Sequence, residues 1–309
     1  MTNRPNVTIL VPLKNERESL EELVRAVQQV LGQEPQEILF VDDGSTDGSW
    51  KLIEELHARD PRIKGVQLRG NFGKSRALSV GFHYAAGEHI ITMDADLQDD
   101  PSDIPAMRKM LEEYDVVSGW RTTRRENLFR RMLTKTFNGT VRRTTGVQLH
   151  DINCGLKAFR REVVKTIKIY GELHRFQPIL AAWNGFRVTE MPVQHHGRKY
   201  GQSRYGLERI LRGFFDLLTV LFLTKYASKP LHLFGRLGLL TAGVGFIIDL
   251  VLVIEWIAGA SIGGRPLLLL GTILIVVGIQ FFTFGLLAEF QSYDREQRQT
   301  DPPVRKELL

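Results

Sequence analysis

Two aspartates and a glutamine lie close together behind an apolar run, and their types and spacing suit the binding of a divalent cation. Asp94 and Asp96 are two residues apart, and Gln98 follows them after the predicted strand His89–Met93. Residues two apart on an extended chain point to the same side, so both carboxylates can reach one hard ion and Gln98 can add an amide oxygen. Such an ion would neutralise a diphosphate. Paired acids also occur in ordinary solvated loops, so the surrounding sequence must decide.

A second acidic segment follows another predicted strand. Asp42, Asp43 and Gly44 come directly after the apolar run Glu37–Val41, where a carboxylate can accept a hydrogen bond from a base or a ribose hydroxyl. The acids from Asp43 onward also have the spacing of a calcium-binding EF-hand loop. That motif requires a preceding helix, whereas the preceding residues are strand-like, so we favour nucleotide binding.

The elements that must position these acids form a strand–helix repeat. Short β-branched runs alternate with amphipathic stretches, which predicts an α/β fold with a largely parallel sheet covered on both faces. Ligands of such sheets collect beyond the carboxyl ends of the strands, where both acidic segments fall. The expected strands are Val7–Pro12, Glu37–Val41, Lys64–Leu68, His89–Met93 and Asp115–Ser118, and the expected helices are Ser19–Leu31, Trp50–Ala58, Ser75–Ala86 and Ile104–Glu113.

Composition excludes several classes of protein. The chain has 309 residues, of which 43% are hydrophobic and 25% are charged, and only 12 prolines, which excludes collagen-like and wholly disordered chains. The single cysteine, Cys154, excludes an internal disulfide and a site of several thiolates, so a metal must be bound by oxygen or imidazole. The net charge of +6 favours an acidic partner such as nucleic acid, anionic lipid or a phosphorylated substrate.

The apolar sequence of the C-terminal third predicts two membrane spans. Leu237–Ile257 and Leu267–Ala288 are each long enough, at about 1.5 Å per residue, to cross a hydrocarbon layer of about 30 Å. The link between them contains one basic residue, Arg265, whereas several lysines and arginines flank the outer ends. The positive-inside bias therefore places both termini in the cytosol. The run Val7–Leu13 is too short for the apolar core of a signal peptide, so the N-terminal part is expected to stay cytosolic.

Charged residues interrupt several apolar stretches. Asp249 and Glu255 lie in the first span. They could make a polar contact inside an oligomer or along a headgroup pathway, or they could be acids that the span tolerates without a function. The apolar stretch Tyr205–Tyr226 is broken by charges and suits an interfacial helix. Residues 121–145 combine arginines with apolar residues at helical spacing, which predicts an amphipathic helix that binds anionic headgroups and lipid phosphate. Its candidate lipid-phosphate ligands are Arg124, Arg125, Arg130, Arg131 and Lys135.

Seven blocks of residues, in order and spacing, resemble the family-two inverting glycosyltransferases. Val11–Glu16, Val41–Ser45, Asn71–Lys74 and Asp94–Gln98 resemble the family as a whole. The later blocks resemble its dolichyl- and undecaprenyl-phosphate sugar transferases, and are Ser118–Arg121, Asp151–Lys157 and Arg198–Tyr205. The resemblance spans about Val7 to Phe290 and implies a Rossmann-like GT-A domain at residues 1–204. Interfacial helices at 205–232, two spans within 233–290 and a cytosolic tail at 291–309 would follow.

The resemblance also implies individual roles. Mg²⁺ or Mn²⁺ would be held by Asp94, Asp96 and Gln98. The donor phosphates would face Arg121, Arg198 and Arg204. Two departures, Lys14 for a frequent tyrosine and Arg204 for a frequent lysine, keep or add positive charge near an anion. The nucleotide would be lined by Pro12, Lys14, Glu16, Val41, Asp43, Asp94, Ala95 and Asp96.

The expected reaction is inverting transfer of one sugar from a UDP- or GDP-hexose to a polyprenyl phosphate, at the cytosolic face of the inner membrane. The metal and the arginines would stabilise the leaving nucleoside diphosphate. The acceptor phosphate is already mostly dianionic at neutral pH, so it hardly needs a base. Besides Asp96, the catalytic candidate is Asp151, as a base or as an orienter of the acceptor and of basic side chains; a structural turn acid is the alternative.

Two other functions remain as alternatives. A processive polysaccharide synthase is disfavoured because the Gln-x-x-Arg-Trp signature is absent and two spans are few for a polymer channel. A catalytically inactive membrane scaffold is disfavoured by the intact acidic triplet. Nucleic acid is not expected as a partner beside two spans, and a homo-oligomer is left open. The adjacent His195 and His196 point to opposite faces of an extended segment, which favours packing and loop roles.

Overall fold

The computed structural model describes residues 5–122, 139, 142–143, 145–169, 173–197, 230–259, 261, 265–297 and 304–308. The chain divides into two compact units, residues 1–217 with 302–309, and residues 218–301. Several predicted features lie outside the described residues. These are residues 205–229 of the interfacial segment predicted at 205–232, the donor-phosphate candidates Arg198 and Arg204, and the lipid-phosphate candidates Arg124, Arg125, Arg130, Arg131 and Lys135.

The first unit is built on an eight-stranded mixed sheet with the strand order β7-β5-β6-β4-β1-β2-β3-β8. Its centre is parallel, since β1 pairs with β2 and β4, and β2 pairs with β3, all in parallel. At the far side β6 runs antiparallel to both β4 and β5. The strands are β1 (Val7–Leu13), β2 (Gln36–Asp42), β3 (Ile63–Leu68), β4 (His89–Thr92), β5 (Val116–Arg121), β6 (Lys157–Arg160), β7 (Val188–Val193) and β8 (Val304–Leu308).

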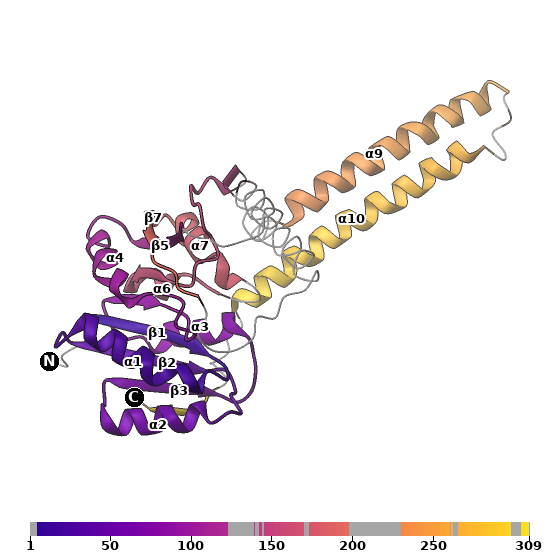
Figure 1. Ribbon diagram of the computed structural model, residues 1–309. Helices are drawn as coiled ribbons and strands as arrows, with labels where there is room; N and C mark the ends of the chain where they lie inside the picture. The colour runs from indigo at the N-terminus through magenta and orange to yellow at the C-terminus, as the bar shows by residue number, and fades with distance from the viewer. Residues whose placement is uncertain are drawn as a thin grey trace. The chain divides into compact units, whose positions relative to one another are not determined.

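Helices cover both faces of this sheet (Figure 1). One core joins Val7, Ile9 and Val11 of β1 to apolar residues of α1, α2 and α4. On the other face, Gly81 of α3 lies against Leu10. Because both faces are covered, all seven residues of β1 are buried, which explains why six of them are apolar. The helices of this unit are α1 (Arg17–Leu31), α2 (Ser49–Arg59), α3 (Lys74–Tyr84), α4 (Ile104–Met110), α6 (Arg161–Thr166) and α7 (Gln177–Trp183), with short 3₁₀ turns η1 (Pro101–Asp103) and η2 (Leu173–Arg175).

The C-terminal residues return to the sheet of the first unit. The strand β8 pairs antiparallel with β3, from Gly65 opposite Leu308 to Leu68 opposite Val304. Figure 1 shows β8 in yellow beside β3, at one edge of the sheet. The sequence predicted neither β8 nor β6 and β7, whereas each of the five expected strands and four expected helices overlaps an observed one.

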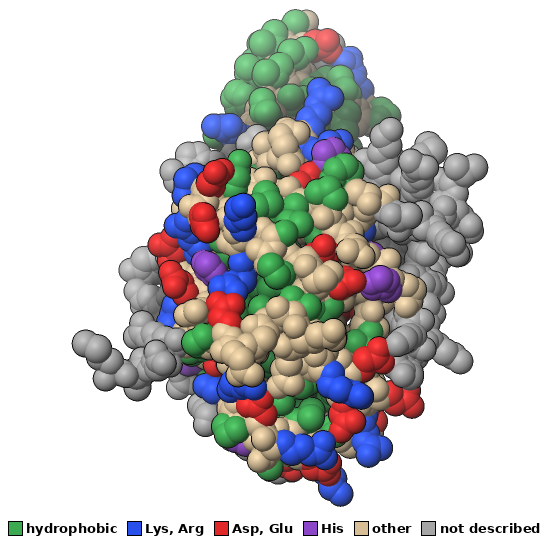
Figure 2. All heavy atoms as spheres, turned by 60° about the vertical axis from the view of Figure 1, so that its left-hand side comes forward, with side chains coloured by type: hydrophobic (Ala, Val, Ile, Leu, Met, Phe, Trp, Pro, Cys, Tyr) green, Lys and Arg blue, Asp and Glu red, His purple; other side chains and the backbone are tan. Residues whose placement is uncertain are grey.

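The second unit is a pair of long apolar helices, α9 (Pro230–Ile257) and α10 (Pro266–Gln297). Within them, Leu233–Ile257 and Pro266–Ala288 are long and apolar enough to cross a membrane, close to the predicted spans. Most of their side chains are exposed, unlike those of a core helix in a soluble protein. Figure 2 shows apolar side chains covering this helix pair, whereas charged and apolar side chains are mixed over the first unit.

Glycines allow α9 and α10 to pack closely. A Cβ atom on Gly238 would lie 2.6 Å from the carbonyl oxygen of Gly278, so only glycine fits there. The carboxyl group of Asp249 lies against Gly271, and its Oδ1 atom has no hydrogen-bond partner among the described residues. Glu255 forms an ion pair with Arg265 beside the turn between the helices. Asp249 is therefore placed between the two helices of the pair.

Candidate donor-binding site

Four loops, which follow the parallel strands β1 to β4 at their carboxyl ends, build the site, and hydrogen bonds join the first two. The backbone amide of Asn15, behind β1, donates to the Ser45 hydroxyl behind β2 at 2.9 Å. The amide of Thr46 donates to the Asn15 side chain at 2.8 Å. Asn15 itself has a φ of 57°, a conformation that asparagine tolerates better than most residues. The β1–α1 and β2–α2 loops therefore form one connected wall.

The acids of residues 42–47 serve mainly to build this wall. Asp47 accepts hydrogen bonds from the amide of Arg17 at 3.1 Å and from the amide of Ser49 at 2.9 Å, so one carboxylate caps the first turns of both α1 and α2. Burial works against ionisation of Asp47, but its hydrogen bonds lower its pKa overall. Gly44 has a φ of 71°, and a Cβ atom there would lie 2.7 Å from the backbone of Gly70. Only glycine permits this approach between the second and third loops.

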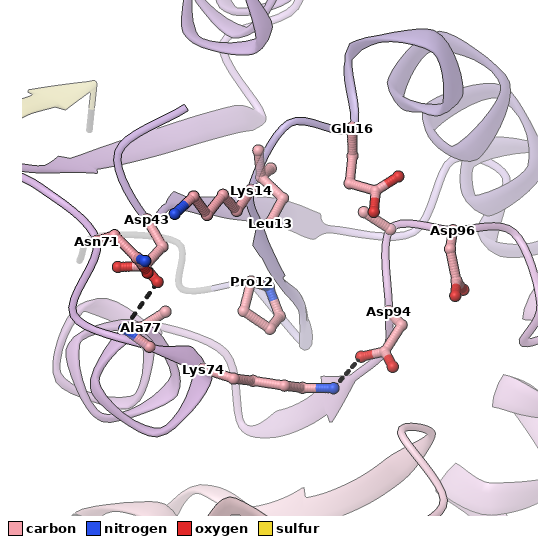
Figure 3. Close-up of a pocket in the computed structure, with 12 residues that line it drawn as sticks. Pro12, Leu13, Lys14, Glu16, Asp43, Asn71, Lys74, Ala77, Asp94 and Asp96 are labelled. Atoms are coloured by element: carbon pink, nitrogen blue, oxygen red, sulfur yellow. Dashed lines mark hydrogen bonds and ion pairs between the residues drawn. The ribbon is translucent and has the colours of Figure 1, made fainter. Parts of the chain in front are cut away.

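A cavity of about 330 Å³ opens between the loops. Figure 3 labels most of the residues that line it and shows their mutual orientation. Val41 does not line it, because that side chain is fully buried within β2. Leu13, Asn71, Gly73, Lys74 and Ala77 line the cavity without having been assigned a role from sequence; the Asn-x-Gly-Lys block was the available signal. The predicted residues that do line it are Pro12, Lys14, Glu16, Asp43, Asp94, Ala95 and Asp96.

Asp43 organises the third loop. Its carboxylate accepts hydrogen bonds from the backbone amides of Phe72 at 2.7 Å and Gly73 at 2.8 Å. With the Asn71 amide group oriented to satisfy its neighbours, its nitrogen donates to Asp43 at 2.9 Å and its oxygen accepts from the Lys14 ammonium at 2.7 Å. Lys14 thus points into the same corner as Asp43 (Figure 3). The carboxylate predicted to meet the base or ribose also holds the loop that closes the cavity.

The predicted metal ligand Asp94 forms an ion pair with a lysine side chain. Lys74, from the first turn of α3, reaches across the cavity, and its Nζ lies 2.5 Å from Oδ1 of Asp94 (Figure 3). Burial would raise the pKa of Asp94, but the charges of Lys74, Lys157 and Arg121 lower it overall. Asp94 is therefore ionised at neutral pH.

Asp96 and Gln98 are placed by an unusual turn and by a distant segment. Leu97, between them, has a φ of 59°, which side chains rarely adopt and which is typical of functional sites. The Gln98 side chain donates to the carbonyl of His196 at 3.3 Å, and the His196 amide donates to the Gln98 carbonyl at 2.8 Å. His196 also contacts Asp100 through Nε2 at 2.8 Å. Both contacts fit the loop role predicted for the histidines; Gln98 is not among the cavity-lining residues.

A buried ion pair lies behind residues Asp94–Gln98, which we call the acidic loop. Arg121, at the end of β5, donates to Asp151 through Nε at 2.7 Å and through Nη2 at 3.1 Å. Asp151 is 3% exposed and also accepts a hydrogen bond from the Asn153 amide. Lys157, beside this pair, donates to the Cys154 carbonyl, and burial lowers the pKa of Lys157 to about 8. Of the roles left open for Asp151, these contacts match the orientation of a basic side chain.

The family is decided by comparison with known proteins. The model of glycosyl transferase family 2 matches residues 8–168. The chain belongs to this family. Dodecaprenyl-phosphate galacturonate synthase from Rhizobium johnstonii is 38% identical to this glycosyltransferase, over 99% of this chain and 95% of its own length. Undecaprenyl-phosphate 4-deoxy-4-formamido-L-arabinose transferase from Salmonella paratyphi A is 37% identical, over 92% of this chain and 87% of its own length. The predicted family is therefore confirmed.

Solved structures confirm the predicted GT-A fold of this glycosyltransferase. Glucosyl-3-phosphoglycerate synthase from Mycobacterium tuberculosis, in complex with Mn²⁺, UDP-glucose and phosphoglyceric acid, matches with a TM-score of 0.53 at 17% identity, over 71% of this chain and 79% of that one. A mannosyltransferase from Pyrobaculum calidifontis, in complex with GDP-mannose and Mn²⁺, matches with a TM-score of 0.51 at 18% identity, over 98% and 78%. At these identities the likeness establishes the fold alone.

The acidic loop of this glycosyltransferase fits a divalent cation in an open site. Asp94 and Asp96 both line the cavity, and a cationic ammonium group already stands on Asp94. Among the residues that the structure describes, no group of three or more histidine, cysteine, aspartate or glutamate side chains could hold a metal. Two carboxylates leave coordination positions for substrate phosphates and water, which is the usual arrangement for Mg²⁺. Burial raises the pKa of the nearby Cys154 thiol to about 12, so it is not a thiolate ligand.

Proposed function

We propose that this chain transfers a single sugar from a nucleotide sugar to the phosphate of a polyprenyl lipid. The observation that carries the proposal is the presence, in one chain, of a cavity of about 330 Å³ that is lined by Asp94 and Asp96, and of a pair of apolar helices. A polar donor and a lipid acceptor require these two features together. The similarity to a synthase and a transferase that are both named for polyprenyl phosphates extends over more than nine-tenths of the chain.

The donor is a nucleotide sugar, UDP- or GDP-linked, with its base near Lys14 and Asp43 and its diphosphate toward Asp94 and Asp96. In this orientation the β1–α1 and β2–α2 loops surround the nucleoside, as the carboxyl ends of parallel strands do in related folds. A bound Mg²⁺ or Mn²⁺ on Asp94 and Asp96, with Gln98 as the third proposed ligand, would stabilise the charge of the leaving diphosphate. Lys74 and Arg121 add positive charge beside it.

The acceptor phosphate needs a cationic environment more than it needs a base. A phosphate monoester is mostly dianionic at neutral pH, since its second pKa is about 6, and it can attack the sugar directly. Asp151 is then a positioning residue, whose ion pair holds Arg121 at 2.7 Å in a fixed direction. The arginines of residues 124–131 and Lys135 remain our proposed headgroup ligands, and Arg198 and Arg204 our proposed donor-phosphate ligands.

We infer that the sheet and both outer ends of the helix pair lie on the same side of the membrane. The strand β8, which follows α10, pairs with β3, which precedes α9. A chain that leaves the first unit, crosses twice and rejoins the same sheet must return to the side from which it started. Together with the basic residues that flank the spans, this supports a cytosolic catalytic domain and C-terminus at the inner membrane.

The test is a donor screen with full-length protein in membranes. Polyprenyl phosphate is incubated with each of a panel of radiolabelled UDP- and GDP-sugars, and labelled lipid is extracted. We expect one donor to give lipid carrying a single sugar, and Asp96→Asn to reduce the rate by about 10²-fold or more, the scale of a lost transition-state contact. Asp60→Asn, at a surface ion pair, is the matched control and should retain the rate.

Each alternative function has its own outcome. No labelled lipid with any donor would contradict the proposal. A polymeric product would favour a processive synthase, and full activity of Asp96→Asn would contradict the proposed role of the acidic loop.

A further inference from the structure

The contact between Lys74 and Asp94 suggests a role that the proposed reaction does not by itself require. The ammonium of Lys74 stands 2.5 Å from Oδ1 of Asp94, where a cation is expected during the reaction. Both side chains are partly open to the cavity, with 37% and 38% of their surface exposed. A ligand that enters the cavity can therefore reach both partners of this ion pair.

The charges around the acidic loop nearly cancel when the cavity holds no ligand. Lys74, Lys157 and Arg121 each interact electrostatically with two or more acids of the cluster. Within this cluster the acids exceed the cations by one charge. A divalent cation alone would leave an excess of positive charge, which a diphosphate would offset. The acids concerned are Asp94, Asp96, Asp99 and Asp151.

Lys74 is the cation of this cluster that can change partners. Arg121 is held by two hydrogen bonds to the buried Asp151. Lys157 is 3% exposed and donates to the Cys154 carbonyl. Lys74, in contrast, extends into the cavity from the start of α3 on a flexible four-carbon side chain, which suits an ammonium that moves between two anions.

We propose that Lys74 is the resident counter-cation of the acidic loop: it neutralises Asp94 while the donor is absent and moves to a diphosphate oxygen when cation and donor bind. The divalent cation consequently binds weakly without a nucleotide and much more tightly with one. The inference rests on the proposed use of a nucleotide-sugar donor. It makes Lys74 a residue that couples metal binding to donor binding, and such coupling is reciprocal.

The test measures Mn²⁺ binding, independently of sugar transfer. Full-length protein in detergent is titrated with Mn²⁺, and free Mn²⁺ is followed by electron paramagnetic resonance, with and without UDP or GDP. The Mn²⁺ that the nucleotide binds in free solution is subtracted. For the wild type we expect the nucleotide to strengthen Mn²⁺ binding. For Lys74→Gln we expect Mn²⁺ binding without nucleotide to tighten about tenfold, and the strengthening by nucleotide to shrink correspondingly, because the competing charge is gone.

The control variants distinguish the effect of losing the Lys74 charge from the effect of a disturbed fold. Lys74→Arg keeps the charge and should bind Mn²⁺ weakly without nucleotide, as the wild type does. Lys51→Gln removes an exposed lysine of α2 and should change neither affinity. Lys74→Met, which keeps the apolar part of the side chain, should reproduce Lys74→Gln and serves if the glutamine variant does not fold.

Unchanged or weaker Mn²⁺ binding by Lys74→Gln without nucleotide would overturn the inference. Equal tightening with and without nucleotide would also overturn it, because Lys74 would then repel the metal without coupling it to the donor. The proposed function fails separately: a wild type that binds Mn²⁺ with nucleotide but labels no lipid would contradict the reaction and leave the role of Lys74 standing.

Discussion

At the scale of single residues, the buried pair of Arg121 and Asp151 shows how position defines chemical role. A buried carboxylate with two hydrogen bonds from a guanidinium group, at 2.7 and 3.1 Å, has few lone pairs left for a proton. Burial alone would lower the pKa of Arg121, but the hydrogen bonds and charge of Asp151 raise it overall. The arginine is therefore permanently charged, and its direction is set by the pair.

A double-mutant cycle tests this assignment. We expect Asp151→Asn and Arg121→Gln each to reduce sugar transfer by about 10²-fold. The double variant should lose little more than either single one, because both substitutions remove the same contact. Initial transfer rates across pH are the measurement. A general base at Asp151 would instead abolish the acidic limb of the pH profile in Asp151→Asn while Arg121→Gln retained it.

The matched control is the surface pair of Arg62 and Asp60, whose Nη2 and Oδ2 atoms are 2.8 Å apart. Exposed pairs contribute about 0–1 kcal/mol, so the corresponding cycle should leave transfer rates unchanged.

At the scale of elements, α3 determines where Lys74 stands. Its N-terminal turn is held by Ser75, whose hydroxyl accepts from the His174 amide at 3.1 Å and contacts the His174 ring at 2.9 Å. Burial, followed by the charge of Lys74, lowers the pKa of His174 to about 3, so this ring is a neutral partner at physiological pH. In the middle of the helix, Gly81 brings α3 close to Leu10 of β1.

Gly81→Ala tests how tightly this helix is seated. Alanine in a helix interior is normally more stable than glycine by about 1 kcal/mol. Here the new Cβ atom would lie 2.2 Å from the Leu10 side chain, so we expect a loss of about 1–3 kcal/mol and weaker donor binding as Lys74 shifts. Thermal unfolding and nucleotide titration measure the two effects. Ser79→Ala, on the same helix and only partly buried, is the control, and stabilisation by Gly81→Ala would contradict the packing.

At the scale of the whole molecule, the pairing of β8 with β3 constrains topology more directly than flanking charge does. The constraint comes from backbone hydrogen bonds between residues on either side of the helix pair. Because both strands belong to one sheet, the chain between residues 68 and 304 must cross a bilayer an even number of times.

Cysteine labelling in intact cells measures this topology. After Cys154→Ala, the chain has no other cysteine, so Ser261→Cys reports the turn between the spans and Ser102→Cys reports the first unit. We expect a membrane-impermeant thiol reagent to label Ser261→Cys in intact cells and Ser102→Cys only after lysis, because a hydrocarbon layer separates them. Labelling of both or of neither in intact cells would contradict a pair of spanning helices.

The sequence alone determined the central elements and the position of the acids. The strands β1 and β2 are buried along their whole length, so their sequences are mainly apolar, and acids mark the loops that follow β2 and β4. The two long apolar helices were equally evident, because length and apolarity are local properties. The strands β6 and β8 were not, since Lys157–Arg160 and Val304–Leu308 are short and rich in charge, and only their pairing makes them strands.

The tertiary structure decided what each side chain of the site contacts. Asp43 holds the loop around Gly73, Asp94 holds Lys74, and Asp151 holds Arg121, across separations of 20 to 30 residues. The fully buried Val41, in contrast, is removed from the cavity by its place in β2. A sequence pattern identifies residues that can bind phosphate or metal. Their partners depend on how loops from separate strands approach one another, and that approach is created only when the sheet assembles.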